Sequence, residues 1–292
     1  DLRINPDLLL MRIMIIGATG LLGKPLMQQW KGVELIGTGS RDLDIRDGVH
    51  VHEFVERKRP DWIVLAAAYT DVDGCEKNPE LAFAVNRDGA INVAKAASAV
   101  GAKLLFLSSD YVFDGRSTTP YEADHQRNPQ SVYGRSKAEA ELSLLAIMPD
   151  CCIVRTSWLF GVGGKCFPDT ILKLAATRSV LDVVDDQRGC PTYTVDLSRA
   201  IAALCRKDAH GIVHASNAGS CTWFDFAREI VAGAGLKTEV RPVSSEQMAR
   251  PAPRPAYSVL SATSLHNYGI EMIEWNDALH RYLDERRISS GN

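Results

Sequence analysis

"RIMIIGATGLLG", residues 12–23, begins as an apolar run with three isoleucines and continues into glycines spaced G-x-x-G-x-x-G. The apolar run predicts a β-strand, and Gly17, Gly20 and Gly23 predict a tight turn into a helix. Such a turn lets the backbone approach a pyrophosphate at the start of a helix. A glycine-rich turn without a ligand is the alternative for the motif alone. The strand before it and the helix after it favour dinucleotide binding.

The segments after this turn repeat the alternation of a short apolar run and a longer amphipathic stretch. Further strands are predicted at residues 33–38, 61–68, 103–109 and 151–157, and helices near residues 21–30, 49–58, 80–100 and 133–147. Asn78 and Pro79 mark the start of the third helix, because Asn caps helices and Pro favours their first turn. The strands are too apolar to alternate, as in parallel sheets covered on both faces. The pattern predicts an α/β fold with a doubly wound, Rossmann-like parallel sheet of five strands.

The domain organisation follows from where this regular spacing stops. Residues 11–155 are expected to form the dinucleotide-binding domain. After about Thr156 the spacing becomes irregular and includes the proline-rich stretch "RPAPRPAY", residues 250–257. Residues 156–292 are therefore expected to form mainly a smaller C-terminal substrate-binding lobe, with some segments returning to the first domain. Residues 1–10 precede Met11 and are expected to be an appended segment outside the fold.

Composition limits the classes of partner. The net charge of −3 provides no basic surface for nucleic acid or anionic membranes, so a small-molecule ligand is expected. Seven cysteines without a C-x-x-C pair argue against a disulfide framework and a zinc site, and predict reduced, mostly buried thiols. No apolar run approaches the roughly 18 residues that span a bilayer, and the first ten residues lack the features of a signal peptide. A cytoplasmic protein is expected.

Tyr133 and Lys137 are the first candidates for chemistry. Their i, i+4 spacing places both side chains on one face of the predicted helix, where an ammonium can favour the phenolate and lower the pKa of the phenol. An exposed helix pair is the alternative. Ser108 and Ser109 end a predicted strand, at the edge where open α/β sheets bind ligands, and a hydroxyl there could hold a carbonyl oxygen. Strand-end capping is the alternative for these serines.

The loop after the second predicted strand bears on cofactor choice. An acid in this loop binds the ribose 2′-hydroxyl of NAD, whereas Ser40 and Arg41 suit the 2′-phosphate of NADP. Asp42 and Asp44 follow in the same loop and keep NAD open. NADPH is therefore the expected cofactor, with NADH as the alternative; a solvated loop without a ligand is the third interpretation.

Several motifs together carry a family resemblance. "AAAYTDVDGCE" (residues 66–76), "SSDYVFDG" (108–115), "YGRSK" (133–137) and "VRTSWLFG" (154–161) follow the glycine motif in order. In this set the chain resembles the extended short-chain dehydrogenase/reductase family and, within it, the dTDP-4-dehydrorhamnose reductases. The resemblance covers nearly the whole chain from Met11, including "VVDDQRGCPTYTVDLSRA" in the second lobe.

The resemblance implies roles for individual residues. Tyr133 would be the proton donor, Lys137 would modulate its pKa and bind the nicotinamide ribose, and Ser109 would position the carbonyl. The implied cofactor-binding residues are Gly17, Thr19, Gly20, Leu21, Leu22, Ser40, Arg41, Asp44, Ile45, Ala66, Ala67, Ala68, Tyr133 and Lys137. The implied substrate-binding residues are Thr70, Val72, Asp110, Tyr111 and Trp158. For Trp158, filling the core is a strong alternative.

Two departures from the family pattern affect these expectations. Where relatives often have two asparagines before a phenylalanine, this chain has "GKCF", residues 164–167, which puts contacts to the nucleotide-sugar in question. Some relatives dimerise about a magnesium ion held by glutamates, and Pro25 and Val195 occupy the matching places here. No metal is therefore expected.

The expected function is reduction by NAD(P)H of the C4 carbonyl of a dTDP-linked 6-deoxy-4-keto-hexose, giving dTDP-L-rhamnose. The expected partners are the nucleotide-sugar and, at most, a second copy of the chain, since monomer and homodimer both stay open. One alternative is a non-catalytic regulatory subunit resembling the β subunit of methionine adenosyltransferase. Another is a sugar-nucleotide epimerase, dehydratase or reductase of the same family. Net consumption of NAD(P)H separates the reductase from the first alternative and from enzymes that re-oxidise their cofactor.

Overall fold

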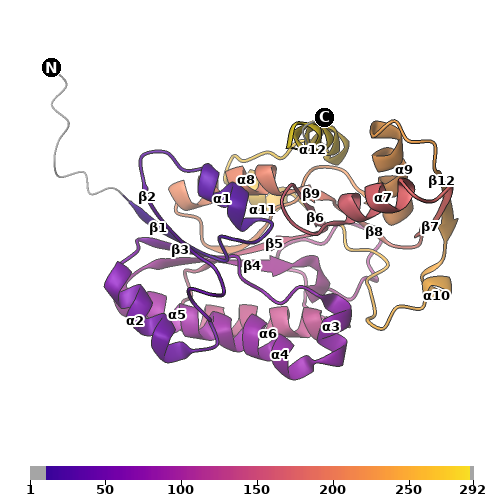
Figure 1. Ribbon diagram of the computed structural model, residues 1–292. Helices are drawn as coiled ribbons and strands as arrows, with labels where there is room; N and C mark the ends of the chain where they lie inside the picture. The colour runs from indigo at the N-terminus through magenta and orange to yellow at the C-terminus, as the bar shows by residue number, and fades with distance from the viewer. Residues whose placement is uncertain (1–10, 290–292) are drawn as a thin grey trace, which may run out of the picture.

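A six-stranded parallel sheet runs through the centre of the protein, which a computed structural model describes for residues 11–289 (Figure 1). In spatial order its strands are β2 (Glu34–Thr38), β1 (Arg12–Ile16), β3 (Trp62–Leu65), β4 (Lys103–Ser109), β5 (Cys152–Thr156) and β10 (Gly211–His214). Chain order reverses between β1 and β3, which creates the switch point where doubly wound sheets bind ligands. The predicted fold class and its five strands are confirmed. The sixth strand, β10, was missed because it is short and ends in the polar residue His214.

Helices cover both faces of the sheet. The helices α2 (Gly48–Lys58), α5 (Gly89–Val100) and α6 (Val132–Ile147) cover one face, and α1 (Gly23–Gln28), α8 (Thr194–Arg206) and α11 (Thr263–His266) cover the other (Figure 1). Three elements of this domain come from beyond Thr156. Helices α8 and α11 pack on the central sheet, and β10 is one of its strands. The second half of the chain therefore contributes to both parts of the molecule.

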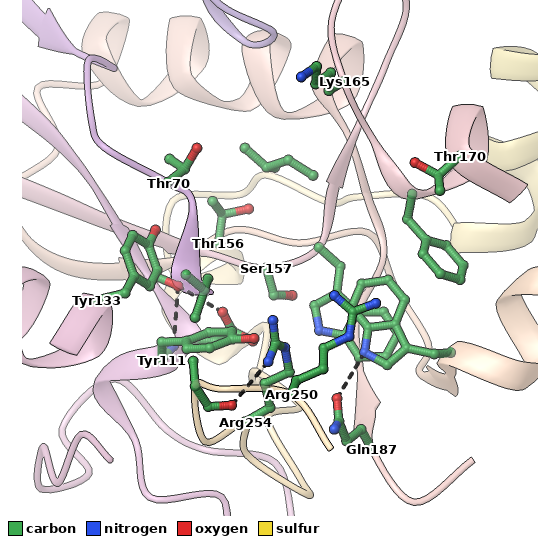
Figure 2. A pocket seen from close by; sticks show the side chains of 18 of the residues that line it. Thr70, Tyr111, Tyr133, Thr156, Ser157, Lys165, Thr170, Gln187, Arg250 and Arg254 are labelled. Carbon is green, nitrogen blue, oxygen red and sulfur yellow. Dashed lines mark hydrogen bonds between the residues drawn. The ribbon is translucent and has the colours of Figure 1, made fainter. Parts of the chain in front are cut away.

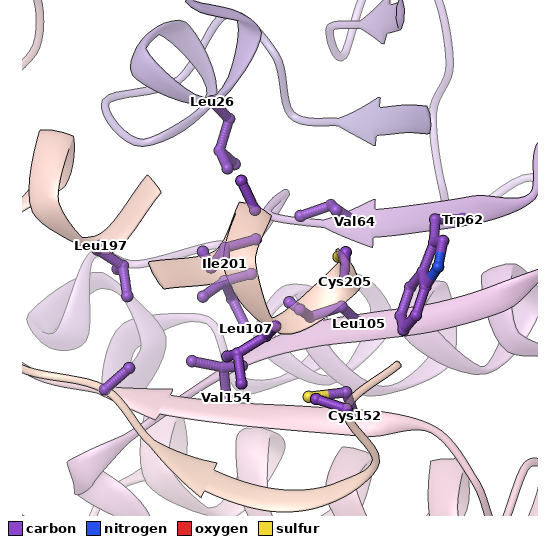
Figure 3. Packing of buried hydrophobic residues seen from close by; sticks show 14 of the residues in the cluster. Leu26, Trp62, Val64, Leu105, Leu107, Cys152, Val154, Leu197, Ile201 and Cys205 are labelled. Atoms are coloured by element: carbon purple, nitrogen blue, oxygen red, sulfur yellow. The ribbon is translucent and has the colours of Figure 1, made fainter. Parts of the chain in front are cut away.

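Successive residues of the strands pack into two separate cores. Ile13 and Ile15 of β1 face α1 and α8, whereas Met14 and Ile16 face α2 and α5. Figure 3 shows the first of these cores, in which side chains of α1 and α8 meet those of β3, β4 and β5. Because both faces are covered, the strands read as continuous apolar runs. All seven cysteines are buried and unpaired, as predicted.

The long helix predicted at residues 80–100 is divided. The short helices α3 (Val72–Lys77) and α4 (Pro79–Phe83) precede a π-helical turn, η1 (Ala84–Asp88), and α5 completes the segment. The predicted start is confirmed, since Asn78 Oδ1 accepts a hydrogen bond from the backbone of Leu81 at 3.2 Å.

Asn86 lies in the π-helical turn. Its side chain is buried, accepts from the backbone N–H of Tyr69 at 2.8 Å and donates to the backbone carbonyl of Tyr69 at 3.0 Å. This amide therefore holds the loop after β3 against the helices of one face.

The remaining elements form a smaller lobe beside the carboxyl ends of the strands (Figure 1). Its helices are α7 (Phe167–Ala175), α9 (Trp223–Gly233), α10 (Ser245–Met248) and α12 (Trp275–Ser289). Its strands pair as β7 (Val180–Val184) with β12 (Glu239–Val243), β6 (Leu159–Phe160) with β9 (Thr192–Tyr193), and β8 (Arg188–Gly189) with β11 (Cys221–Thr222). Phe160, Phe226 and Tyr282 are fully buried in its core. Within residues 11–289, no helix has the length and apolar character needed to cross a membrane.

Candidate active site

A cavity of about 1100 Å³ opens between the carboxyl edge of the sheet and the smaller lobe. One end is lined by the glycine-rich turn and by the ends of β3 and β4 together with the first turns of α6. The other end is lined by α7, β7, Trp223, α10 and the loop at residues 249–254 that follows it. We call these the reaction end and the lobe end. The cavity lies where the order of strands in the sheet predicts a ligand site.

The glycine-rich turn is shaped for close backbone approach. Gly17 has φ +97°, and a Cβ there would lie 2.6 Å from the backbone nitrogen of Ala67. A Cβ on Gly23 would lie 2.0 Å from the carbonyl oxygen of Gly17, so only glycine allows the helix to start so close to the strand. Gly17 and Gly20 both line the cavity. The turn therefore fits the pyrophosphate of a dinucleotide.

Tyr133 lies in the first turn of α6 and faces the end of β4. Ser131 caps this helix by accepting from Gly134 N at 3.1 Å, and a Cβ on Gly134 would lie 2.2 Å from the carbonyl oxygen of Tyr111. This close packing sets the ring of Tyr133 edge-on to that of Tyr111, with centroids 5.6 Å apart. Tyr133 and Ser109 both line the reaction end of the cavity. Burial raises the pKa of Tyr133 well above its usual value.

Lys137 lies one turn further along α6 and is also buried. Its Nζ donates to the carbonyl oxygen of Leu107 on β4 at 2.7 Å and lies 4.5 Å from the ring centre of Phe106. Burial lowers the pKa of Lys137 to about 7. The expected lowering of the Tyr133 pKa by Lys137 is wrong for this arrangement. Burial dominates, and the ammonium is directed at the Leu107 carbonyl.

Ser109 and Asp110 connect β4 to the short helix η2 (Asp110–Val112). Ser109 Oγ donates to Asp110 Oδ1 at 2.9 Å and accepts from Tyr111 N at 3.2 Å. The Asp110 side chain is buried, and this burial raises its pKa to about 6. These two hydrogen bonds hold the hydroxyl of Ser109 in place at the reaction end.

The structure brings most of the expected site residues to this one cavity. Those that line it are Gly17, Gly20, Leu21, Leu22, Ala66, Ala68, Thr70, Val72, Ser109, Asp110, Tyr111, Tyr133, Lys137 and Trp158. Those that are not part of its lining are Thr19, Ser40, Arg41, Asp44, Ile45 and Ala67. Ile45 is a core residue of the α2 and α5 face, which explains its place outside the cavity.

The loop after β2 holds the residues expected to choose the cofactor. Asp42 Oδ2 accepts from Gly39 N at 2.9 Å, which closes the turn. Asp44 forms an ion pair with Arg46, and hydrogen bonds from this guanidinium hold the pKa of Asp44 below its usual value. Arg46 was not foreseen. Both acids thus have partners within the loop, while Arg41 is exposed beside them.

Trp158 pairs with a tryptophan that sequence analysis missed. The rings of Trp158 and Trp223 are stacked with centroids 3.5 Å apart and planes 7° from parallel. Trp158 has φ +47°, a backbone conformation that bulky residues rarely adopt. Trp223 Nε1 donates to Gln187 Oε1 at 3.2 Å (Figure 2). Gln187 Nε2 donates in turn to Ser245 Oγ at 2.6 Å. No local signal could find Trp223, because it lies far from Trp158 in the sequence.

Basic side chains also face the lobe end. Arg254 donates to both carboxylate oxygens of Asp73, at 3.1 and 3.0 Å, and Arg250 lies 3.7 Å from the same carboxylate. These contacts tie the proline-rich loop to α3. Lys165, from the stretch that departs from the family pattern, also lines the cavity (Figure 2).

The protein is an enzyme of the extended short-chain dehydrogenase/reductase class. Three features define this class here: the parallel sheet, the glycine-rich turn, and the meeting of Ser109, Tyr133 and Lys137 at one cavity. A family model described as the RmlD substrate binding domain matches residues 11–288, and the chain belongs to this family.

Three similar proteins illustrate the match. Spore coat polysaccharide biosynthesis protein SpsK of Bacillus subtilis is 40% identical over 94% of this chain and 98% of that protein. The dTDP-4-dehydrorhamnose reductase of Streptomyces griseus is 42% identical over 92% of this chain and 91% of that protein. The crystal structure of dTDP-4-dehydrorhamnose reductase from Bacillus anthracis in complex with NADP superposes with a TM-score of 0.92 at 39% identity, covering 94% of this chain and 99% of that one.

The two positions that motivate the metal prediction lie in α1 and α8. Pro25 is buried and Val195 is half-buried. Within residues 11–289, no group of three histidine, cysteine or acidic side chains is placed to hold a metal ion. That no metal takes part in catalysis stays a prediction.

Proposed function

We propose that this enzyme reduces the C4 carbonyl of dTDP-4-dehydro-L-rhamnose with NADPH to give dTDP-L-rhamnose. The observation that carries the proposal is the meeting of Ser109, Tyr133 and Lys137 with the glycine-rich turn at one end of a single cavity. The named relatives are similar over nearly the whole chain, which supports the same substrate class.

The cofactor would lie across the carboxyl edge of the sheet. The glycine-rich turn would hold its pyrophosphate, Ala66 and Ala68 would flank it, and Lys137 would contact the nicotinamide ribose. When bound, NADPH supplies the hydride.

Ser109 and Tyr133 would act on the carbonyl oxygen. Tyr133 donates a hydrogen bond to this oxygen as negative charge develops on it and delivers its proton, and Ser109 donates to the oxygen in place of its hydrogen bond to Asp110. The raised pKa of Tyr133 keeps the phenol protonated at neutral pH, which suits a proton donor. The pKa of Lys137, about 7, leaves part of it as ammonium at neutral pH, which suits its proposed contact with the nicotinamide ribose.

The lobe end would bind the rest of the substrate. Trp158 and Tyr111 offer flat apolar surface and a hydroxyl to a 6-deoxy sugar, and Arg250 and Lys165 offer positive charge to the diphosphate. Ser40 and Arg41 support NADPH over NADH, because both nearby acids have partners within the loop. The cytoplasmic location and the monomeric or homodimeric state stay predictions.

The test is a coupled measurement of cofactor and product. With dTDP-4-dehydro-L-rhamnose, we expect one NADPH oxidised per dTDP-L-rhamnose formed, with the product identified by NMR. The UDP-linked sugar serves as the control for the nucleotide. A regulatory subunit would consume no NADPH, and an epimerase or dehydratase would convert substrate without net oxidation, so either result would contradict the proposal.

A further inference from the structure

A buried carboxylate lies on α6 one turn beyond Lys137, outside the cavity lining. Glu141 has 0% of its surface exposed and accepts hydrogen bonds from Arg155 Nε at 2.9 Å and Arg155 Nη2 at 2.7 Å. It also accepts from Arg127 and from the hydroxyl of Ser108. Burial alone would raise the pKa of Glu141, but the hydrogen bonds and charges of the two arginines hold it below its usual value.

These contacts join three elements of the reaction end. Ser108 of β4 and Arg155 of β5 are direct neighbours across the sheet, and both reach the carboxylate on α6. Ser108 immediately precedes Ser109, and the carbonyl of Leu107 accepts from Lys137. The carboxylate of Glu141 therefore fixes α6 against the three residues of β4 that contact or form the candidate site.

The charges around Lys137 are few. Glu141 lies one turn away on its own helix and favours the ammonium form, as does Cys75 of α3 if ionised, although burial raises the pKa of that thiol to about 11. Tyr133 on α6 and Asp110 in η2 line the same cavity as Lys137. Of this set, Glu141 is the carboxylate on the same helix as Lys137, at the i, i+4 spacing that places both side chains on one face.

The opposite side of the cluster is occupied by a neutral group. His214 of β10 lies with Nε2 3.3 Å from Arg155 Nη1, and burial lowers the pKa of His214 to about 3. The histidine is therefore uncharged at neutral pH and adds no third positive charge to those of the two arginines.

We propose that Glu141 is a positioning residue for the reduction, which holds the Tyr133 and Lys137 face of α6 in register with Ser109 and favours the ammonium form of Lys137. This inference rests on the proposed function for its turnover readout, but its electrostatic part concerns Lys137 alone. Glu141 itself does not line the cavity.

Glu141→Gln is the test, since it removes the charge and keeps the size and the acceptor oxygen. We expect kcat to fall about tenfold and the titration midpoint of Lys137 to move down by about one pH unit. The midpoint is read from the 13Cε signal of labelled lysine, assigned with Lys137→Arg. Asp196→Asn is the matched control, because Asp196 is a buried carboxylate paired with Arg281 away from the cavity.

The control should lose stability while kcat and the Lys137 titration stay as in the parent enzyme. An unchanged kcat together with an unchanged Lys137 midpoint in Glu141→Gln would overturn the inference, as would an equal loss of kcat in Asp196→Asn. If the parent enzyme oxidises no NADPH, the proposed function fails, and the Lys137 titration still decides the electrostatic role.

Glu141→Gln can fail to fold, because it leaves Arg155 buried without its counter-charge. Ser108→Ala then decides the positioning role, since it removes one contact of Glu141 and keeps every charge. We expect a three- to tenfold lower kcat, about 1 kcal/mol for one hydrogen bond, with the Lys137 midpoint unchanged. A kcat equal to that of the parent enzyme would overturn it.

Discussion

The two ends of the cavity are built in different ways. At the reaction end, Ser109 closes a strand, and Tyr133 and Lys137 share a face of one helix. At the lobe end, Trp158 of the loop between β5 and β6 meets Trp223 at the distant start of α9, and Trp158 has a left-handed backbone conformation. Regular secondary structure therefore fixes the candidate catalytic groups, whereas tertiary contacts fix the surface for the rest of the substrate. Substitutions at the two ends should therefore differ in how far they change the turnover number and how far they change the binding of substrate and cofactor.

The largest effect is expected at the reaction end. Tyr133→Phe removes only the hydroxyl, so kcat should fall by about 10²- to 10⁴-fold, the usual contribution of a general acid. The NADPH dissociation constant, measured by fluorescence titration, should change little, because the aromatic ring remains. Turnover near that of the parent enzyme would remove Tyr133 from the candidate site.

This contrast also explains what could be predicted from sequence. The i, i+4 spacing of Tyr133 and Lys137 and the strand end at Ser109 are local patterns, so the residues that line the reaction end could be named. Trp223 could not, because its contact with Trp158 depends on the lobe fold. The pKa argument for Tyr133 also failed, since burial and the direction of the Lys137 side chain are tertiary properties.

The next effect is expected where the two regions meet, at Asp110. Its pKa is raised by burial from 3.8 to about 6, so its favourable contribution to stability is complete below pH 3.8 and is lost as pH rises through 6. The ionised form should cost about 3 kcal/mol at neutral pH. Asp110→Asn stays neutral and still accepts from Ser109. Its advantage in unfolding free energy over the parent enzyme should therefore grow between pH 4 and pH 7 in urea titrations. A difference in unfolding free energy that is constant with pH would contradict the raised pKa of this buried carboxylate.

At the lobe end, a smaller effect on turnover is expected. Trp158→Ala removes the aromatic surface proposed to contact the sugar, so kcat/KM for the nucleotide-sugar should fall about 30-fold, or ~2 kcal/mol. The affinity for NADPH should remain. Trp223→Ala is the companion variant, because it removes the stacking partner and leaves Trp158 in place.

Each outcome for this pair is informative. A smaller loss in Trp223→Ala than in Trp158→Ala would support direct sugar contact by Trp158. Loss of folding in Trp158→Ala would instead make that tryptophan a core residue, and unchanged kcat/KM in both variants would place the sugar elsewhere in the cavity.

The smallest effect is expected in the loop after β2, which neither end of the cavity includes. Arg41 is exposed, so its interaction with a 2′-phosphate should contribute about 1 kcal/mol at low salt. Arg41→Ala should therefore narrow the preference for NADPH over NADH about fivefold, measured as the ratio of kcat/KM values for the two cofactors.

Arg46→Ala serves as the control for removing a positive charge, but it also frees Asp44, which could then bind the ribose 2′-hydroxyl of NADH. Arg46→Ala should accordingly raise kcat/KM measured with NADH. Arg41→Ala should lower kcat/KM measured with NADPH and leave the value for NADH unchanged. Equal use of both cofactors by the parent enzyme, unchanged in the two variants, would show that this loop does not select the cofactor.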